Sequence, residues 1–216
     1  MSHLSRVLNS TRNIPHMTDQ QAHLLQQLMI THQPETCAEL GTFHGKSALI
    51  HAAILEDLGA GSITTYDMAG MINSISPTCD QLAHSLNLSH RLHTVVAEKT
   101  YMWELAKLIR STAEPIWDWC YIDGAHHYAG AALSFYLADE LLKPGGIVLF
   151  DDIGWMPSGA HVNARERAIY EQILCEEQFS VCAVDWVCDQ VARNGRYLEL
   201  TEPAHTAVQW RVFRRL

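Results

Sequence analysis

The sequence has little positive charge and lacks the patterns of a membrane-spanning chain. Its 216 residues include 15 lysines and arginines against 24 acids, giving a formal net charge of −9, and the one basic cluster comprises Arg211, Arg214 and Arg215. A chain without a basic stripe is poorly suited to a nucleic-acid backbone. The sequence has no run of 18 apolar residues, and its polar start has no apolar signal core. We therefore expect a cytoplasmic protein with neither a membrane nor a nucleic-acid partner.

The six cysteines form no Cys-x-x-Cys pair. Several lie in apolar runs typical of strands, which favours reduced, buried thiols over a disulfide framework. No internal repeat, low-complexity segment or linker interrupts the chain, whose length suffices for one α/β domain with a sizeable core.

What the chain does contain is an alternation of strand and helix patterns. Predicted strands are 36–40, 62–66, 92–97, 119–122 and 147–150; predicted helices are 19–31, 46–58, 80–86, 101–111, 130–142 and 163–176. This alternation predicts a largely parallel sheet in an α/β fold. Residues 1–17 are expected to be irregular. Two β-rich runs, 179–187 and 207–214, predict an antiparallel hairpin at one edge.

A glycine-rich turn follows the first predicted strand, with the sequence Glu39-Leu40-Gly41-Thr42-Phe43-His44-Gly45-Lys46-Ser47. Only three residues separate Gly41 from Gly45, too few for a P-loop, and Phe43 stands where a dinucleotide fingerprint needs its second glycine. The turn still allows a ligand to approach N–H groups at a helix N-terminus. Asp67, after the next strand, is placed to accept hydrogen bonds from a ribose. The alternative is that both glycines serve only the turn.

Three acids follow two further predicted strands. Asp123 comes after 119–122, and Asp151 and Asp152 come after 147–150. Because parallel strands end at one edge of a sheet, these carboxylates should lie together, which is costly unless they hold a cation or titrate unusually. His126 lies nearby and titrates in the range needed to take a proton from a hydroxyl. The alternative is that the acids and histidines only cap turns.

Together these segments resemble a known family. The motifs E-L-G-T-x-x-G-x-S-A, I-D-G-A-H-H-Y and K-P-G-G-I-V-L-F-D-D are similar to those of class I S-adenosylmethionine (SAM)-dependent methyltransferases, in the metal-dependent O-methyltransferase branch of the catechol and caffeoyl-CoA type. The resemblance implies a Rossmann-like α/β fold whose seven-stranded sheet is mostly parallel, with a C-terminal antiparallel hairpin and helices on both faces. It also implies an N-terminal lid or helical segment over residues 1–35 and a SAM-binding methyltransferase domain over 36–216.

The resemblance implies roles for individual residues. Glu39 would hold the amino group of SAM, Ser47 would meet its carboxylate, and Asp67 would bind its ribose. The implied SAM-binding set is Glu39, Gly41, Thr42, Phe43, Gly45, Ser47, Asp67, Met68, Glu98 and Asp123.

A metal ion is implied beside the methyl donor. Asp123, Asp151 and Asp152 would bind Mg²⁺ or another hard divalent ion, which would polarise an acceptor hydroxyl. His126 would be the general base that takes the hydroxyl proton.

Two departures from the catechol pattern bear on the acceptor. His126 stands where catechol-type enzymes have lysine, and Asp152 where they commonly have asparagine. Both are similar to macrocin-type and cephalosporin-associated natural-product enzymes, so we expect a small-molecule acceptor bearing a sugar, phenol or other natural-product hydroxyl. Trp155, Met156 and the loop 68–78 are candidate walls of its pocket.

Two other functions stay open. One is a binding or accessory protein that keeps the SAM fold without methyl transfer, although a decayed site would not need to retain Glu39, Asp67, Asp123 and His126. The other is a non-haem iron oxygenase using His126, His127 and an aspartate, although adjacent histidines before a helix do not readily face one ion. The sequence leaves open whether the chain forms a homo-oligomer.

Overall fold

The computed structural model describes residues 1–160 and 162–216, and a sheet of seven strands forms its centre. The strands are β1 (Thr36–Leu40), β2 (Ser62–Met68), β3 (Leu92–Ala97), β4 (Trp117–Ile122), β5 (Leu142–Phe150), β6 (Tyr197–Glu199) and β7 (Arg211–Arg215). Their order is β3-β2-β1-β4-β5-β7-β6. Strands β1 to β5 pair in parallel, whereas β7 runs antiparallel to both β5 and β6. The predicted fold class is confirmed.

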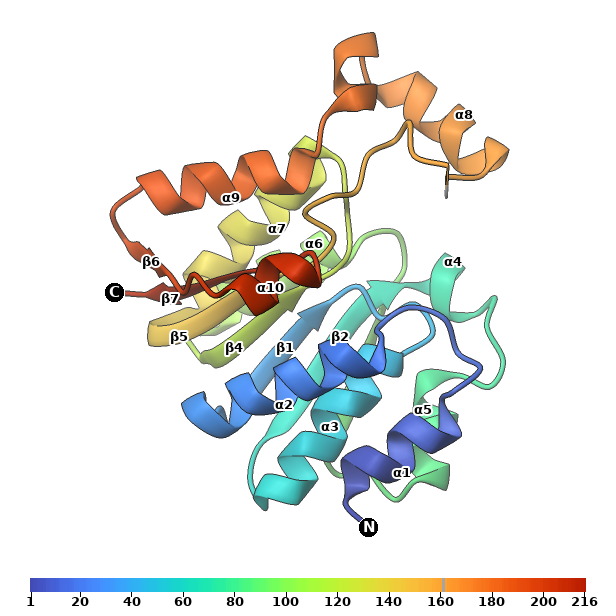
Figure 1. The fold of residues 1–216 in the computed structure, drawn as a ribbon, viewed down its shortest axis with the longest axis vertical. Helices are drawn as coiled ribbons and strands as arrows, with labels where there is room; N and C mark the ends of the chain where they lie inside the picture. Colours follow the sequence, from blue (N-terminus) through green and yellow to red (C-terminus); the bar gives the residue numbers. More distant parts are fainter. Residues whose placement is uncertain (161) are drawn as a thin grey trace.

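Helices cover both faces of this sheet (Figure 1). They are α1 (His3–Ser10), α2 (Asp19–His32), α3 (Lys46–Leu58), α4 (Ala69–Ile72), α5 (Cys79–Ser85), α6 (Tyr101–Ser111), α7 (Tyr128–Leu141), α8 (Ala164–Ile173), the 3₁₀ helix η1 (Glu176–Ser180), α9 (Ala183–Arg193) and α10 (Pro203–Ala207). Helices α1, α2, α3 and α5 belong to one hydrophobic core, and α6, α7 and α9 to the other.

The central strands are buried on both faces because their side chains alternate between the two cores. On β4, Trp119 and Tyr121 enter the core of α2 and α3, whereas Cys120 and Ile122 enter the core of α6 and α7. Successive side chains point to opposite faces of the sheet, and both faces are buried. The central strands are therefore continuous apolar runs in the sequence.

The helix boundaries follow local signals. Thr18 caps α2 in a capping box with Gln21. Helix α3 ends at Gly59, which adopts the left-handed conformation (φ 80°) that favours glycine.

The N-terminal segment was predicted to be irregular, and this is wrong for residues 3–10. They form α1, which packs on α3 by burying Leu4 and Val7. Asp57 at the end of α3 accepts hydrogen bonds from the backbone N–H groups of His3 (2.9 Å) and Leu4 (3.1 Å). These donors have no partner within their own helix, so the carboxylate fixes the N-terminus of α1.

The β-rich run predicted at 179–187 is also wrong, because the chain there ends η1 and begins α9. Its buried residues Val184, Val187, Cys188 and Val191 recur at the spacing of a helix face. The antiparallel pair at the edge is formed by β6 and β7, which are joined through α10. Part of the second predicted run, 207–214, does become β7.

The sequence led us to expect reduced cysteines and no membrane-spanning segment. All six cysteines are free thiols, and Cys37, Cys79, Cys120 and Cys188 are buried. Over residues 1–160 and 162–216, every helix is too short or too polar to span a bilayer.

Candidate active site

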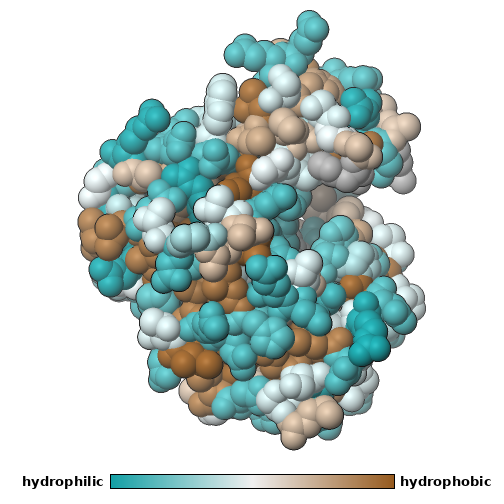
Figure 2. Space-filling view, in the orientation of Figure 1, coloured by the Kyte–Doolittle hydropathy of each residue, from teal (hydrophilic) through white to brown (hydrophobic). Residues whose placement is uncertain are grey.

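The carboxyl ends of β1, β2, β4 and β5 meet at one edge of the sheet. Leu40 pairs with Ile122, and Ile122 pairs with Phe150, so the residues that follow these strands are neighbours. The Asp123 N–H donates to the Leu40 carbonyl (2.9 Å), and the Asp151 N–H donates to the Ile122 carbonyl (3.0 Å). Figure 2 shows a hollow in the surface between α8 and α4, above this edge. Such an edge is where α/β sheets usually bind ligands.

The glycine turn is held tightly against this edge. Gly41 has a φ of 106°, and a Cβ built there would lie 2.3 Å from the carbonyl oxygen of Asp123. Only glycine allows that approach. Asp67 holds the turn from its other side, because its Oδ2 accepts the N–H groups of Thr42 (3.0 Å) and Phe43 (2.8 Å). The turn and the Asp123 loop are therefore in direct contact.

Glu39 is a buried acid beneath the turn. Its Oε2 accepts a hydrogen bond from the Thr65 hydroxyl at 2.6 Å. Burial raises the pKa of Glu39 to about 8, although contacts with Ser47 and Thr65 lower it. Its Oε1 is buried and has no hydrogen-bond partner among the described residues. Because a buried polar atom without a partner is costly, this oxygen fits a ligand that brings a donor.

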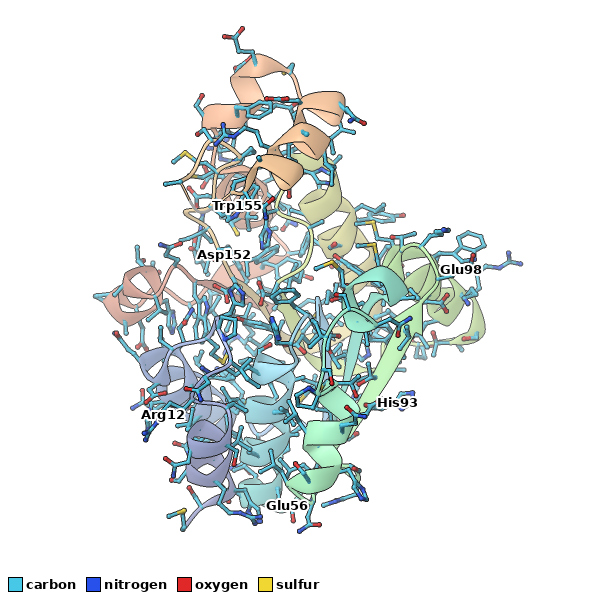
Figure 3. The ribbon with its side chains drawn as sticks, turned by 90° about the vertical axis from the view of Figure 1, so that its right-hand side faces the viewer. Arg12, Glu56, His93, Glu98, Asp152 and Trp155 are labelled. Atoms are coloured by element: carbon cyan, nitrogen blue, oxygen red, sulfur yellow. The ribbon has the colours of Figure 1, made fainter. Side chains whose placement is uncertain are left out.

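A second group of side chains lies after β4 and β5. His126 Nε2 lies 3.1 Å from Asp152 Oδ2 and 3.7 Å from Asp123 Oδ1. One donor atom from each of these three residues lies within 4.8 Å of the others, which is a spacing that could hold a metal ion. We call this set, Asp123, His126 and Asp152, the Asp-His-Asp cluster. Figure 3 shows Asp152 and Trp155 on the same side of the molecule, below the α8 segment.

Asp151 lies beside the cluster without joining it. Its Oδ2 accepts a hydrogen bond from the buried Tyr121 hydroxyl, and its Oδ1 accepts the N–H of Asp152 at 2.7 Å. Burial, followed by the charges of Asp123 and Asp152, raises the pKa of Asp151 well above its usual range. Its predicted role as a metal ligand stays a prediction.

The charges of the cluster are strongly coupled. Burial opposes a charge on His126, but the Asp123 and Asp152 carboxylates outweigh burial and raise its pKa to about 10. Burial also raises the pKa of Asp123, against the contact with His126. Without a bound cation, His126 therefore carries the positive charge that balances the two acids.

The remaining predicted SAM-binding residues lie in the turn or at the carboxyl ends of β2 and β3. Ser47 contacts Glu39, Gly45 (φ 76°) packs on Cys79, and Met68 follows Asp67 at the end of β2. Glu98 is exposed and follows Ala97, which pairs with Met68, so it also lies at this edge of the sheet. The roles of these residues in SAM binding stay predictions.

Three residues that contact the predicted site residues were not themselves predicted from the sequence. Thr65 is the partner of Glu39 across the β1–β2 pair, a position that strand register alone would have indicated. Tyr121 binds Asp151, and His16 packs its ring on Phe43 at 5.2 Å between centroids. The Ile14 carbonyl accepts a hydrogen bond from Lys46 (3.1 Å), so the segment between α1 and α2 lies against the glycine turn.

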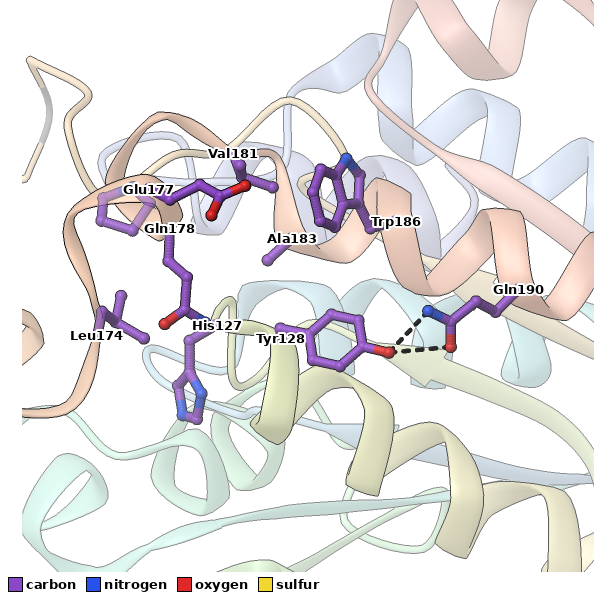
Figure 4. Close-up of a pocket in the computed structure, with 10 residues that line it drawn as sticks. His127, Tyr128, Leu174, Glu177, Gln178, Val181, Ala183, Trp186 and Gln190 are labelled. Atoms are coloured by element: carbon purple, nitrogen blue, oxygen red, sulfur yellow. Dashed lines mark hydrogen bonds between the residues drawn. The ribbon is translucent and has the colours of Figure 1, made fainter.

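A pocket of about 320 Å³ lies between the start of α7, η1 and α9 (Figure 4). Its walls are Tyr128, Pro157, Leu174, Val181, Ala183 and Trp186, with the polar residues His127, Glu177, Gln178 and Gln190. The predicted wall residues Trp155 and Met156 do not line it, but Trp155 stacks on His126 with centroids 5.1 Å apart.

His127 has a different place from its neighbour His126. Its Nδ1 accepts the N–H of Gly130 (3.2 Å) and so caps α7. The cluster within the described residues thus contains one histidine, whereas the iron-oxygenase alternative needs two.

Comparison with known proteins identifies the fold and the family. Residues 38–153, more than half of the chain, match the family described as a methyltransferase domain. No curated protein matches the sequence.

Similar solved structures cover nearly the whole chain. The Podospora anserina methyltransferase PaMTH1, bound to S-adenosylhomocysteine (SAH), is 18% identical, with a TM-score of 0.68 over 100% of this chain and 88% of that one. An SAH-bound Bacillus cereus O-methyltransferase is 17% identical (TM-score 0.64; 99% and 90% covered). The O-methyltransferase TomG of tomaymycin synthesis in Streptomyces achromogenes, bound to SAM, is 15% identical (0.64; 100% and 90%). The chain belongs to the methyltransferase domain family and has the Rossmann-like fold of these enzymes.

Proposed function

We propose that the protein is a SAM-dependent O-methyltransferase that methylates a hydroxyl group of a small molecule. The observation that carries this proposal is the contact between the glycine turn and the Asp123 loop, where a Cβ on Gly41 would lie 2.3 Å from the Asp123 carbonyl oxygen. A methyl donor bound at the turn would therefore lie beside the Asp-His-Asp cluster. The methyl donor and the acceptor hydroxyl would then both lie at one edge of the sheet.

The residues around the turn fit the polar groups of SAM. The Oε1 atom of Glu39 lacks a hydrogen-bond partner among the described residues, and the ammonium group of SAM would supply its donor. Asp67 Oδ2 accepts two N–H groups of the turn, whereas Oδ1 accepts only the Met68 N–H (2.7 Å) and keeps a second acceptor site for a ribose hydroxyl. Binding SAM would thus satisfy groups that the protein alone leaves open.

The cluster suits a divalent cation because two carboxylates and an imidazole converge there. A bound cation would lower the pKa of an acceptor hydroxyl and hold its oxygen for attack on the methyl group. Asp123 and Asp152 would orient that hydroxyl, and the Trp155 ring would keep His126 in place.

His126 as general base stays a prediction, and its charge limits it. With a pKa raised to about 10 by Asp123 and Asp152, the ring is protonated at neutral pH and has no lone pair for a hydroxyl proton. As long as Asp123 and Asp152 keep that proton on His126, the ring cannot take another.

The pocket of Figure 4 suggests what the acceptor carries. Trp186 is 51% exposed although it is large and apolar, and it faces Tyr128 across the pocket. Glu177 is the one charged side chain in the described lining, and no lysine or arginine contributes to it. We infer a neutral or cationic acceptor with an apolar body, such as a sugar-bearing or phenolic natural product. An acyl-CoA, with its phosphates, would meet no cation here.

Calorimetric titration with SAM and SAH tests the proposal. The wild-type chain should bind both, and Gly41→Ala should weaken binding at least tenfold, because its Cβ would displace the Asp123 loop. Gly70→Ala in α4 is the matched control, since a Cβ there meets nothing within 4 Å. If the folded wild-type chain binds neither compound, the proposal is wrong.

A further inference from the structure

We infer that His126 is a metal ligand and that the Asp-His-Asp cluster selects a divalent transition-metal ion over Mg²⁺. This inference rests on the proposed function, and it replaces two sequence-based expectations: His126 as general base and Asp151 as a ligand. Its basis is the position of the three donor atoms, the environment of Asp151 and the backbone of Asp152.

The donor atoms have the spacing of ligands around a shared ion. With metal–ligand bonds of about 2.1 Å, neighbouring ligand atoms lie about 3.0 Å apart at octahedral angles and about 3.4 Å apart at tetrahedral angles. His126 Nε2 lies 3.1 Å from Asp152 Oδ2 and 3.7 Å from Asp123 Oδ1. The atom is buried, yet it makes no hydrogen bond of good geometry to either carboxylate. It lies close to both oxygens, as a ligand atom around a common centre does.

The backbone turns Asp152 towards this centre. Asp152 has a φ of 56°, in the left-handed region that few non-glycine residues adopt. Strained positions of this kind concentrate at functional sites. The conformation brings the Asp152 carboxylate to His126, whereas the carboxylate of the adjacent Asp151 lies elsewhere.

Asp151 is held out of the cluster by partners of its own. Tyr121 donates its hydroxyl proton to Oδ2, and the Asp152 N–H donates to Oδ1. Each oxygen thus already accepts one hydrogen bond, and the side chain is buried. Its contacts position the backbone of Asp152, so Asp151 is a positioning residue for the cluster.

The ligand chemistry decides the metal. Mg²⁺ prefers oxygen donors, whereas imidazole suits Fe²⁺, Ni²⁺, Cu²⁺ and Zn²⁺, and Mn²⁺ binds most weakly of the first-row series to a given site. A set of one imidazole and two carboxylates therefore favours the transition ion. The Trp155 ring packs against the imidazole of His126, with centroids 5.1 Å apart and the ring planes at 30°.

Manganese is the probe for the test, because its electron paramagnetic resonance (EPR) signal reports bound ion and neighbouring nuclei without turnover. The full chain, freed of metal with EDTA and dialysed, is titrated with Mn²⁺. Pulsed EPR should then show ¹⁴N coupling from a directly bound imidazole, and a tenfold excess of Mg²⁺ should leave most Mn²⁺ bound.

Variants separate the two possible ligand sets. His126→Asn should remove the nitrogen coupling and weaken Mn²⁺ binding at least about tenfold, since even losing a residue behind a ligand costs that much. Asp151→Asn, which keeps an acceptor for Tyr121, should retain the coupling. His127→Asn is the matched histidine control, because asparagine can still cap α7.

The inference is overturned if wild-type Mn²⁺ shows no nitrogen coupling, if no Mn²⁺ binds, or if Mg²⁺ displaces it at equal concentration. It is also overturned if Asp151→Asn abolishes binding while His126→Asn preserves it. SAM titration in EDTA measures donor binding separately, so failure of the metal inference is distinguishable from failure of the proposed function.

Discussion

At the scale of single residues, Glu39 shows how burial and function are linked. Its carboxyl is buried beneath the glycine turn, and one of its oxygens lacks a hydrogen-bond partner among the described residues. Burial raises its pKa to about 8, so near neutral pH much of the protein carries a neutral Glu39. An ammonium group arriving beside it would favour the ionised form.

SAM binding near pH 7 should therefore release a proton from Glu39. Calorimetry in buffers of different ionisation enthalpy measures this proton directly, and Glu39→Gln should eliminate its release and weaken binding. Thr65→Ser, which keeps the hydroxyl donor to Glu39, should retain both. Equal heats in all buffers for the wild-type chain would show that Glu39 does not meet the amino group.

The same raised pKa predicts a pH-dependent stability. A carboxyl with a higher pKa in the folded than in the unfolded state adds stability below its unfolded pKa, and that stability is lost as pH rises through about 8. Thermal unfolding should thus show Glu39→Gln gaining stability relative to wild type between pH 6 and 9. A constant difference over that range would contradict the assigned burial.

The sequence predicted the acidic residues of the site but not the residues that donate hydrogen bonds to them. Glu39 and Asp67 lie near the carboxyl ends of β1 and β2, and Asp123 follows β4; the apolar runs in the sequence indicate these positions. Tyr121 lies within a strand and reaches Asp151 across the β4–β5 pair, 30 residues away. That contact depends on strand register and side-chain direction, which single-residue patterns do not encode. The same holds for Thr65.

At the scale of elements, the chain alternates between strand patterns and helix patterns of apolar residues. This alternation predicted β1 to β5 and the helices between them. The tail was harder, because residues 179–187 are rich in β-branched and aromatic residues that favour strands. Packing overrides this preference, since burying Val184, Val187, Cys188 and Val191 requires a helix face. Helix α1 was missed because two buried residues, Leu4 and Val7, give too short a pattern.

Docking of α1 should depend on Asp57. Burial opposes a charge on this side chain, but hydrogen bonds from His3 and Leu4 lower its pKa below the usual range. Asp57→Ala should cost about 1 kcal/mol, the usual effect of losing a helix cap. It should also expose residues 1–17 to protease. Exposed Glu114→Ala, in the α6–β4 loop, is the control.

This contribution should vary with pH in a defined direction. The stability from Asp57 is present above the pKa of an unfolded aspartate and is lost as pH falls through its lowered folded value. The difference in melting temperature between wild type and Asp57→Ala should shrink in acid. A difference that grows on acidification would contradict the role.

At the scale of the whole molecule, charge and pocket chemistry point to the same class of acceptor. The chain carries a net charge of −9, and the described pocket lining contains one carboxylate and neither lysine nor arginine. Both features disfavour polyanionic substrates. The acceptor's chemical identity was not readable from the sequence, because residues from three separate segments form the pocket.

Screening hydroxyl-bearing natural products for transfer of labelled methyl groups from SAM tests this account of the acceptor. For an accepted compound, Trp186→Ala should raise KM about tenfold, as expected when roughly 1.5 kcal/mol of apolar burial is lost. Trp103→Ala, on exposed α6, should leave KM unchanged. Turnover of a CoA thioester, or an unchanged KM in Trp186→Ala, would contradict the assignment.

In this proposal, the glycine turn and the Asp-His-Asp cluster face each other across one reaction site. A crystal structure of the chain with SAM and Mn²⁺ tests it most directly. We expect the SAM amino group to lie on Glu39 and the methyl group to face the site of the acceptor oxygen beside Asp123, His126 and Asp152. SAM bound elsewhere, or with its methyl group turned away from the cluster, would contradict it.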